Sequence, residues 1–366
     1  MAEKKYTRIV VEENNEHGFD SYRVPGIVTA SNGDLLLTYE GRKDGGNSRT
    51  LFLRRYRMTG ETIESIGERV TMVSPNDDEL IHNPLLIAAA EGKLYFFWCQ
   101  DYKRLFLKES DDNGVSFGTE RELTSLIDGF RKEWPVTLWA IAPGHGISKK
   151  DGTLILPLWL SRGENAHLPA CFACLSSQDQ GKTWRCSSVV PAGNGVGDPT
   201  ESSVAERSDG TLLATMRHEI PGVRRRAFCE SKKVLFRSDG EDTIRWGEPW
   251  LNQELPDPIC GGALLSLSDG KMAFVNCAYG DEPALERQKQ GESVRWSLDA
   301  RQKLTIRLSK DDGVTWNDGL MIAEEGGASD LAGKDAIACF YEEGWQDGNC
   351  IFNQRLSLAV IPLVLL

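Results

Sequence analysis

The chain has 366 residues, of which 42 are Lys or Arg and 54 are Asp or Glu, so its formal net charge is −12. This charge argues against a general nucleic-acid-binding protein and against docking on an anionic membrane, because both surfaces would repel the protein. Hydrophobic residues at 40% and charged residues at 26% are ordinary for a globular protein and exclude a disordered chain.

Short apolar runs recur along the chain, each after a turn-type sequence such as NGD, EGK or DGT. They are rich in Val, Ile, Leu, Phe and Tyr and lack a helical period, so each predicts a strand of a β-hairpin. In chain order they are residues 34–41, 93–100, 153–160, 211–218 and 271–278. The apolar tail at residues 356–366 is shorter than the roughly 20 residues that a membrane span needs, and predicts a final core strand.

A sharper repeat lies between these runs. It reads Ser110-x-Asp112-x-Gly114-x-Ser116-Phe117, and recurs from Ser177 to Trp184 and from Ser309 to Trp316. A shortened copy runs from Ser238 to Trp246, and a degraded copy from Tyr56 to Ile63. Asp and Ser side chains bond turn amides, and Gly adopts a conformation that other residues avoid, so we interpret the motif as a folding device and its aspartates as non-catalytic.

The spacing of the repeat predicts the architecture. Copies stand about 60–70 residues apart, which gives about six units in an all-β chain and is typical of a propeller. No linker divides the chain. The sequence therefore predicts one six-bladed β-propeller domain over residues 1–366.

The nine cysteines are an odd number, and the charged N-terminus has no apolar signal segment. Both features favour free thiols in a reducing compartment and predict a cytoplasmic location, although a truncated secreted protein would look the same. Cys171 and Cys174 form a CxxC inside an apolar run, and we interpret them as small buried residues. No metal site or cofactor is predicted.

The repeats resemble the Asp boxes of the sialidase (neuraminidase) superfamily, and the resemblance extends over most of the chain. Its opening motif is Tyr22-Arg23-Val24-Pro25, and further similar segments lie at residues 39–55, 144–147, 201–217, 255–260, 301–304 and 340–342. Asp boxes alone would be a weak signal. Three arginines and a glutamate in the family's order make a strong one.

The resemblance implies a site for an anionic sugar. Arg23, Arg217 and Arg301 would hold the carboxylate of a sialic acid, because guanidinium groups bind carboxylates through charge-assisted, partly bidentate hydrogen bonds. Glu342 would orient Arg23. Asp44 would protonate the leaving oxygen and then serve as base, although it lies about one residue earlier than the family pattern places it.

The resemblance also implies a tyrosine nucleophile, which sialidases use among glycosidases, with Glu201 as the carboxylate that activates it. In this sequence Ala328 stands at the tyrosine position, within GGASDLA. Four explanations are open: loss of hydrolysis with sugar binding retained, deliberate removal of the nucleophile, attack by water with Glu201 or Asp44 as base, or another tyrosine such as Tyr341 in its place.

Other residues have weaker claims. His145 and His218 could be a base or line a pocket, and Trp139 and Trp159 could stack on a sugar, but structural roles are more common for such residues. The basic run Arg224-Arg225-Arg226 could extend the positive field over the site, but we interpret it as a solvated loop.

The sequence thus predicts a glycoside hydrolase that resembles an exo-α-sialidase and releases terminal α-linked sialic acid. The alternatives are a non-catalytic sialic-acid-binding propeller, favoured by Ala328, and a propeller glycosidase or lyase for another acidic sugar. The expected partners are sialic-acid-containing glycans or free sialic acid, not nucleic acid or membranes, and the sequence does not predict an oligomeric state.

Overall fold

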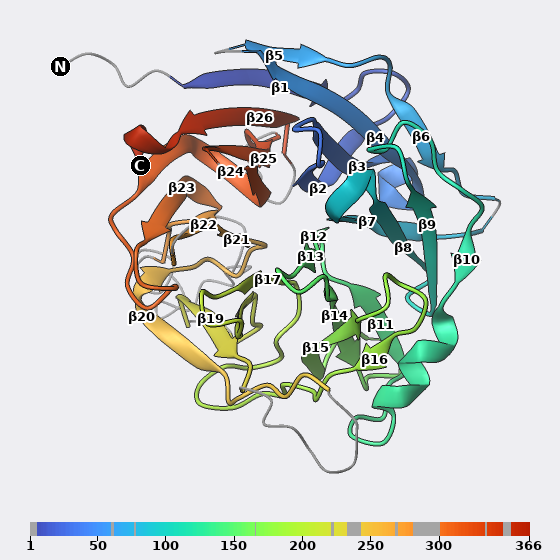
Figure 1. Ribbon diagram of the computed structural model, residues 1–366, viewed down its shortest axis with the longest axis vertical. Coiled ribbons are helices and arrows are strands. Elements are labelled where there is room, and N and C mark those ends of the chain that lie inside the picture. Colours follow the sequence, from blue (N-terminus) through green and yellow to red (C-terminus); the bar gives the residue numbers. More distant parts are fainter. Residues whose placement is uncertain are drawn as a thin grey trace.

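The computed structural model describes residues 6–59, 62–76, 78–164, 166–220, 223–232, 243–267, 270–280, 301–333, 335–346 and 353–366. These residues form a ring of antiparallel sheets around a common centre, with the chain running once round the ring (Figure 1). Among them the helical segments are four short 3₁₀ helices: η1 (Asp44–Gly46), η2 (Ala90–Gly92), η3 (Thr124–Phe130) and η4 (Leu363–Leu365). Within the same ranges, no helix is long and apolar enough to cross a membrane.

Four sheets follow in chain order. The first contains β2 (Ser21–Thr29), β3 (Leu35–Lys43), β4 (Ser48–Thr59), β5 (Thr62–Ser65) and β6 (Val70–Val73). The second contains β7 (Ile81–Ala88), β8 (Leu94–Gln100), β9 (Arg104–Ser110), β10 (Arg121–Glu122) and β12 (Gly144–His145). The third contains β11 (Leu138–Ile141), β13 (Ile147–Ser148), β14 (Leu154–Ser161), β15 (Ala170–Ser177) and β16 (Arg185–Cys186). The fourth contains β17 (Ser202–Glu206), β18 (Leu212–Met216), β19 (Arg225–Glu230) and β20 (Trp250–Pro256).

A seven-stranded sheet closes the ring. It contains β21 (Ala263–Ser266), β22 (Met272–Cys277), β23 (Gln302–Ser309), β24 (Leu320–Gly333), β25 (Ala336–Glu343), β26 (Arg355–Pro362) and β1 (Thr7–Glu13). The first half of β24 pairs with β23 and the second half with β25. β1 pairs with β26, so the two ends of the ring are joined by hydrogen bonds. The all-β, propeller-like architecture is confirmed, whereas the blade number of six stays a prediction, because the described residues form five hydrogen-bonded sheets.

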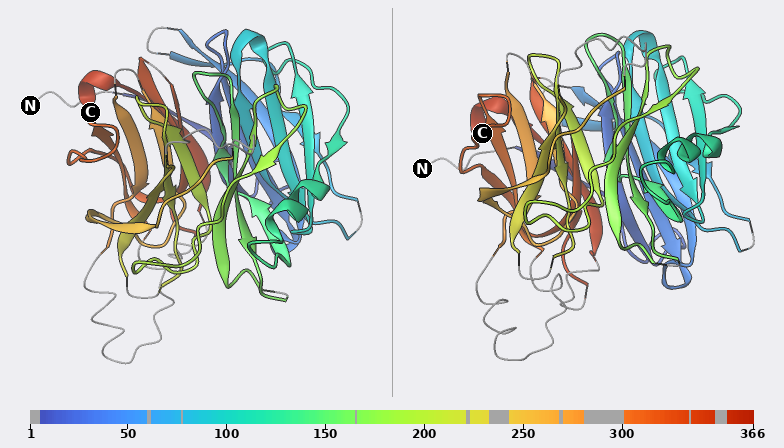
Figure 2. Two further views of the ribbon diagram at one scale, coloured as in Figure 1. Left: turned by 60° about the horizontal axis from the view of Figure 1, so that its bottom comes forward. Right: turned by 90° about the horizontal axis from the view of Figure 1, so that it is seen from below.

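The five apolar runs singled out in the sequence are β3, β8, β14, β18 and β22, and the apolar tail contains β26. Each of the five is flanked by strands on both sides, and side chains from other strands cover both of its faces. All seven residues of β8 are buried, for example, which explains why the run is continuously apolar and not alternating. The sheets stand edge-on around the ring and pack face to face, as the side views show (Figure 2).

The three full repeats are tight turns held by their aspartates. Asp112 accepts hydrogen bonds from the backbone and hydroxyl of Ser116, at 2.9 and 2.6 Å, and the Gly114 amide donates to Ser110 at 3.0 Å. Gly114 has a φ of 76°, which a side chain would resist. The hydrogen bonds from Ser116 to the Asp112 carboxylate lower the pKa of Asp112 to about 2. The other two copies repeat the pattern at Asp179 and Asp311.

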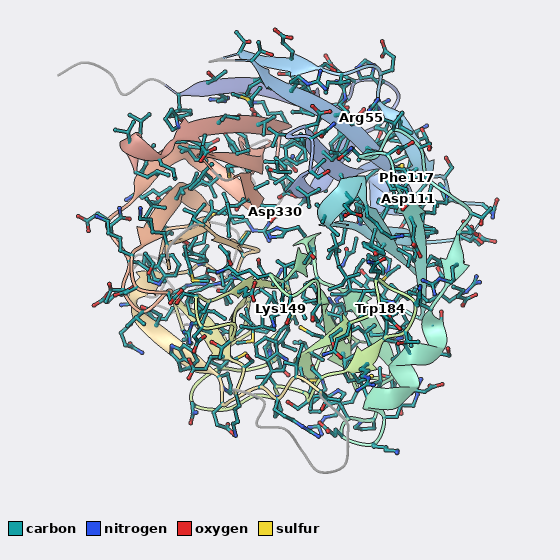
Figure 3. All side chains as sticks on the ribbon, in the orientation of Figure 1. Arg55, Asp111, Phe117, Lys149, Trp184 and Asp330 are labelled. Carbon is teal, nitrogen blue, oxygen red and sulfur yellow. The ribbon has the colours of Figure 1, made fainter. Side chains whose placement is uncertain are left out.

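The motif residues lie away from the ring centre, as the labelled Asp111, Phe117 and Trp184 show in Figure 3. Their interpretation as a folding device is therefore confirmed. Residues 238–242 of the shortened copy and 60–61 of the degraded copy lie outside the described residues.

Candidate functional site

A cavity of about 530 Å³ lies where the sheets converge. Each sheet contributes to its wall: Arg23 comes from β2, Asn83 from β7, Trp159 from β14, Ser202 from β17 and Ala328 from β24. Cavities of this size accept small organic ligands. The wall also contains Arg217, Arg301, Glu201 and Glu342, so the structure brings together all the predicted site residues except Asp44.

Backbone strain gathers at this wall. Val24, Asn83 and Tyr102 all line the cavity and have φ values of 61°, 54° and 54°. Positive φ is unfavourable for side-chain-bearing residues, most of all for a β-branched one such as Val24. Such strain is typical of functional sites, where surrounding contacts hold residues in unfavourable conformations.

Glu342 holds the first arginine. Its side chain is 2% exposed, and Arg23 Nε donates to its Oε1 at 2.7 Å while Nη2 donates to Oε2 at 3.3 Å. Backbone N–H groups of Val24 and Ala328 also donate to Glu342. Burial opposes ionisation of Glu342, but Arg23 and these bonds outweigh it and hold its pKa below the usual range. Glu342 is therefore a buried carboxylate that fixes the Arg23 side chain, which agrees with an orienting role.

Arg217 lies between two carboxylates. Its Nη1 donates to Glu201 Oε2 at 3.0 Å, and its Nε lies 2.8 Å from Glu219 Oε1. Burial of Glu201 is outweighed by Arg217, so its pKa is lowered. For Glu219 burial dominates over Arg217 and the pKa is raised. Glu201 is therefore a carboxylate at neutral pH and is chemically able to act as a base.

Arg301 is the least satisfied of the three arginines. The residue is 8% exposed, lines the cavity, and its Nε has no hydrogen-bond partner. No carboxylate of the described residues forms an ion pair with it. A buried guanidinium N–H without a partner is costly, and a bound anion would satisfy it.

Ala328 and Glu201 lie beside each other at Gly261. A Cβ atom added to Gly261 would lie 3.6 Å from both Ala328 Cβ and Glu201 Oε2, which is ordinary van der Waals distance. The nucleophile position and the carboxylate that would activate a nucleophile are therefore neighbours in the cavity wall. Tyr341 does not fill the position, because its ring is fully buried in β25 and is absent from the cavity wall.

Asp44 begins the short helix η1 between β3 and β4, and its side chain is exposed. It does not line the cavity, whereas Arg42 and Arg49 on either side of this turn do. The structure therefore places the turn at the cavity edge but not the Asp44 carboxylate in the wall. Its acid/base role stays a prediction.

Of the residues with weaker claims to a role in the site, one lines the cavity and the others have structural positions. Trp159 lines the cavity, whereas Trp139 belongs to a buried core cluster. His145 is buried and bonds Asp330 through Nδ1 at 2.6 Å, near the ring centre where Asp330 is labelled (Figure 3). His218 is buried and bonds the Arg225 carbonyl at 3.0 Å. Both histidines thus have structural partners, as expected. Cys171 and Cys174 are buried in β15, also as expected.

The interpretation of Arg224–Arg226 as a solvated loop is wrong. Arg226 is fully buried in β19 and bonds Asp257 at 3.2 Å and the Cys260 carbonyl at 2.7 Å. Arg224 is 5% exposed. Side chains at alternate positions of a strand point to the same face, so Arg224 and Arg226 share one face and are buried together there. Arg226 fixes the segment that ends at Gly261 and Gly262 in the cavity wall.

Several residues of the wall were not predicted. Arg42 and Arg49 lie within the segment that resembles the family around Asp44, and Glu219 lies two residues beyond Arg217. Their closeness in sequence to motif residues was the signal from which a place in the wall could have been predicted. No group of three or more His, Cys, Asp or Glu side chains suited to a metal occurs in the described ranges.

Comparisons with known proteins agree on one family. The sequence profile of the BNR repeat-like domain matches residues 27–349. The chain is 25% identical to a sialidase of Micromonospora viridifaciens over 86% of its own length and 48% of that protein, and 24% identical to mouse Sialidase-3 over 91% and 90%. It thus spans about half of the bacterial relative and most of the mouse one.

Solved structures show the same fold. The Hadza microbial sialidase Hz136 superposes with a TM-score of 0.72 at 20% identity, over 95% of this chain and 67% of that one. The Trypanosoma rangeli sialidase in complex with sialic acid gives a TM-score of 0.65 at 17% identity, over 99% and 58%. With the repeats, the ring of sheets and the match over residues 27–349, these findings lead to one conclusion: the chain belongs to the BNR repeat-like domain family, within the sialidase superfamily.

Proposed function

We propose that this protein binds a terminal α-linked sialic acid through Arg23, Arg217 and Arg301 and hydrolyses its glycosidic bond. The observation that carries the proposal is that three guanidinium groups from separate parts of the chain line one cavity. A sialoside has a carboxylate on its anomeric carbon, and converging guanidinium groups match that anion. The names of the relatives, all sialidases of low identity, support the same substrate class.

In this proposal hydrolysis does not use the tyrosine nucleophile that the resemblance implies, because Ala328 stands at that position and has no nucleophilic atom. We assign the attack to water. The water oxygen bonds to the anomeric carbon from the side of Ala328, Glu201 accepts its proton, and the glycosidic C–O bond breaks with its electron pair on the leaving oxygen. Asp44 supplies the proton to that oxygen if its turn closes over the substrate. Because water attacks opposite the leaving group, the sugar is released with inverted anomeric configuration.

A second candidate is a non-catalytic sialic-acid-binding propeller. Ala328 favours it, and so does the exposed position of Asp44 outside the cavity wall. Binding through the three arginines is common to both candidates, and only turnover separates them.

The experiment is incubation with a fluorogenic α-sialoside, with Glu201→Gln as the matched variant and free-sialic-acid titration in parallel. Release by the wild type and loss of release in Glu201→Gln support hydrolysis. Binding without release favours the non-catalytic candidate. If sialic acid does not bind but a uronic acid or another ulosonic acid does, the ligand is that sugar and the proposal of a sialic acid is wrong.

A further inference from the structure

Two arginines of the cavity wall lie directly opposite each other on neighbouring strands. Arg42 near the end of β3 and Arg49 near the start of β4 are register partners, and both line the cavity. Their side chains are 20% and 15% exposed. Like charges directly opposite in an antiparallel pair are destabilising, and partial burial increases the repulsion. A compensating negative charge is therefore expected at this place.

The protein supplies one such charge, on Glu40. This carboxylate is fully buried, and Arg42 Nη2 lies 2.6 Å and Arg49 Nη1 3.6 Å from the same oxygen, Oε2. The other oxygen accepts the Asn83 amide at 2.8 Å. Burial opposes ionisation, but the two arginines and this bond bring the pKa of Glu40 to about 2, so it carries a full charge at neutral pH. One negative charge thus faces two positive charges.

The three arginines of the proposed carboxylate cup have more acidic groups beside them than Arg42 and Arg49 have. Three acidic side chains, Glu201, Glu219 and Glu342, line the cavity with them, so the cup contains as many acidic groups as arginines. Arg42, Arg49 and Glu40 leave an excess of one positive charge. Arg49 Nε donates to the Gly46 carbonyl at 3.0 Å, and its side chain also interacts with Tyr102, so the guanidinium is held in place at the cavity wall.

We propose that Arg42 and Arg49 form a second anion-binding subsite, which takes a sulfate or carboxylate group on the same glycan whose sialic acid occupies the three-arginine cup. The preferred ligand is then a dianionic glycan. Its second charge comes either from a sulfate ester on the sugar or from the carboxylate of an adjacent sialic acid. Apolar surface of the same cavity wall comes from Tyr102 and Trp159, whose rings lie 6.0 Å apart and both line the cavity.

The inference rests on the proposed function, since the cup holds the first carboxylate. Calorimetric titration compares three probes on the full chain: methyl α-sialoside, its sulfate ester, and an α2,8-linked disialic acid. We expect at least one dianionic probe to bind tenfold or more tightly than the monoanionic one. In Arg49→Gln this ratio should fall to near one. The control is Arg57→Gln, which removes the same charge from the same strand outside the cavity wall, where the exposed Arg57 side chain pairs with the buried Asp34, and it should keep the ratio.

The two dianionic probes distinguish the source of the second charge. Equal affinity of wild type for all three probes overturns the second subsite and leaves the proposed function standing, and this comparison does not depend on whether any variant folds. If the monoanionic probe does not bind, the proposed function fails, and inorganic sulfate then tests the subsite alone. Saturable sulfate binding that Arg49→Gln abolishes supports the subsite, and absence of sulfate binding overturns it.

Discussion

The replacement Arg301→Ala is the clearest probe of the carboxylate cup. Arg301 is buried at the cavity wall with its Nε unpaired, and no described carboxylate depends on it for an ion pair. Two charge-assisted hydrogen bonds to a ligand carboxylate, at about 1.5 kcal/mol each, amount to about 3 kcal/mol. We therefore expect the dissociation constant for sialic acid to rise roughly a hundredfold.

The contrast with Arg23→Ala makes the test specific. That replacement leaves Glu342 buried without its ion-pair partner and should destabilise the fold by about 3–5 kcal/mol. Calorimetric titration with sialic acid, combined with urea unfolding of both variants, measures the two effects separately. If Arg301→Ala keeps its affinity within threefold of wild type while remaining folded, the cup does not bind the ligand and the reasoning is refuted.

Three further predictions concern the nucleophile position, acid stability and a buried ion pair. Ala328→Tyr should raise sialoside turnover at least tenfold and change the first-released anomer from inverted to retained, as NMR of the fresh product would show; unchanged rate and stereochemistry would contradict the position assigned to Ala328. Because the pKa of Glu40 is about 2 in the fold and near 4.5 when unfolded, its stabilising effect is complete above pH 4.5 and is lost as the pH falls towards 2. The loss is on the order of 3 kcal/mol, so the urea midpoint of the wild type should decrease as the pH is lowered from 5 to 3, and that of Glu40→Gln should decrease less. If the two midpoints decrease equally with pH, Glu40 is not the source of the acid sensitivity. Arg226→Met should destabilise the protein by about 3–5 kcal/mol, because Asp257 would stay buried without its partner at 3.2 Å, and an unfolding midpoint equal to wild type would show that the pair contributes nothing.

Much of the fold was predictable because its signals are local. The strands β3, β8, β14, β18 and β22 appear as continuous apolar runs, since both faces of a central strand are covered. The Asp-type turns appear because their hydrogen bonds join residues four positions apart or fewer. The number of blades is less accessible, because β24 pairs with partners on both sides and joins two sets of strands into one sheet.

The residues of the candidate site were identified where a motif fixes their position in the sequence. Arg23, Arg217, Arg301, Glu201 and Glu342 were found through their neighbours in sequence, and they converge on one cavity.

Residues whose role depends on a distant partner were missed or misread. Arg226 resembled a solvated charge because Asp257 and the Cys260 carbonyl lie more than 30 positions away. The opposed pair Arg42 and Arg49 became visible only with the strand register. The turn at Asp44 lies near the cavity, but no local signal states where its carboxylate points.

The closure of the ring by its last strands has a consequence for the order of assembly during synthesis. Arg23 is synthesised early, whereas Glu342, the carboxylate that holds it, follows 319 positions later. Loops of such length close slowly, so assembly of the ring is a late event. A nascent chain in which only the first four sheets have formed contains Arg23 and Arg217 but lacks Arg301 and Glu342, so the proposed carboxylate cup is complete only when the final strands dock.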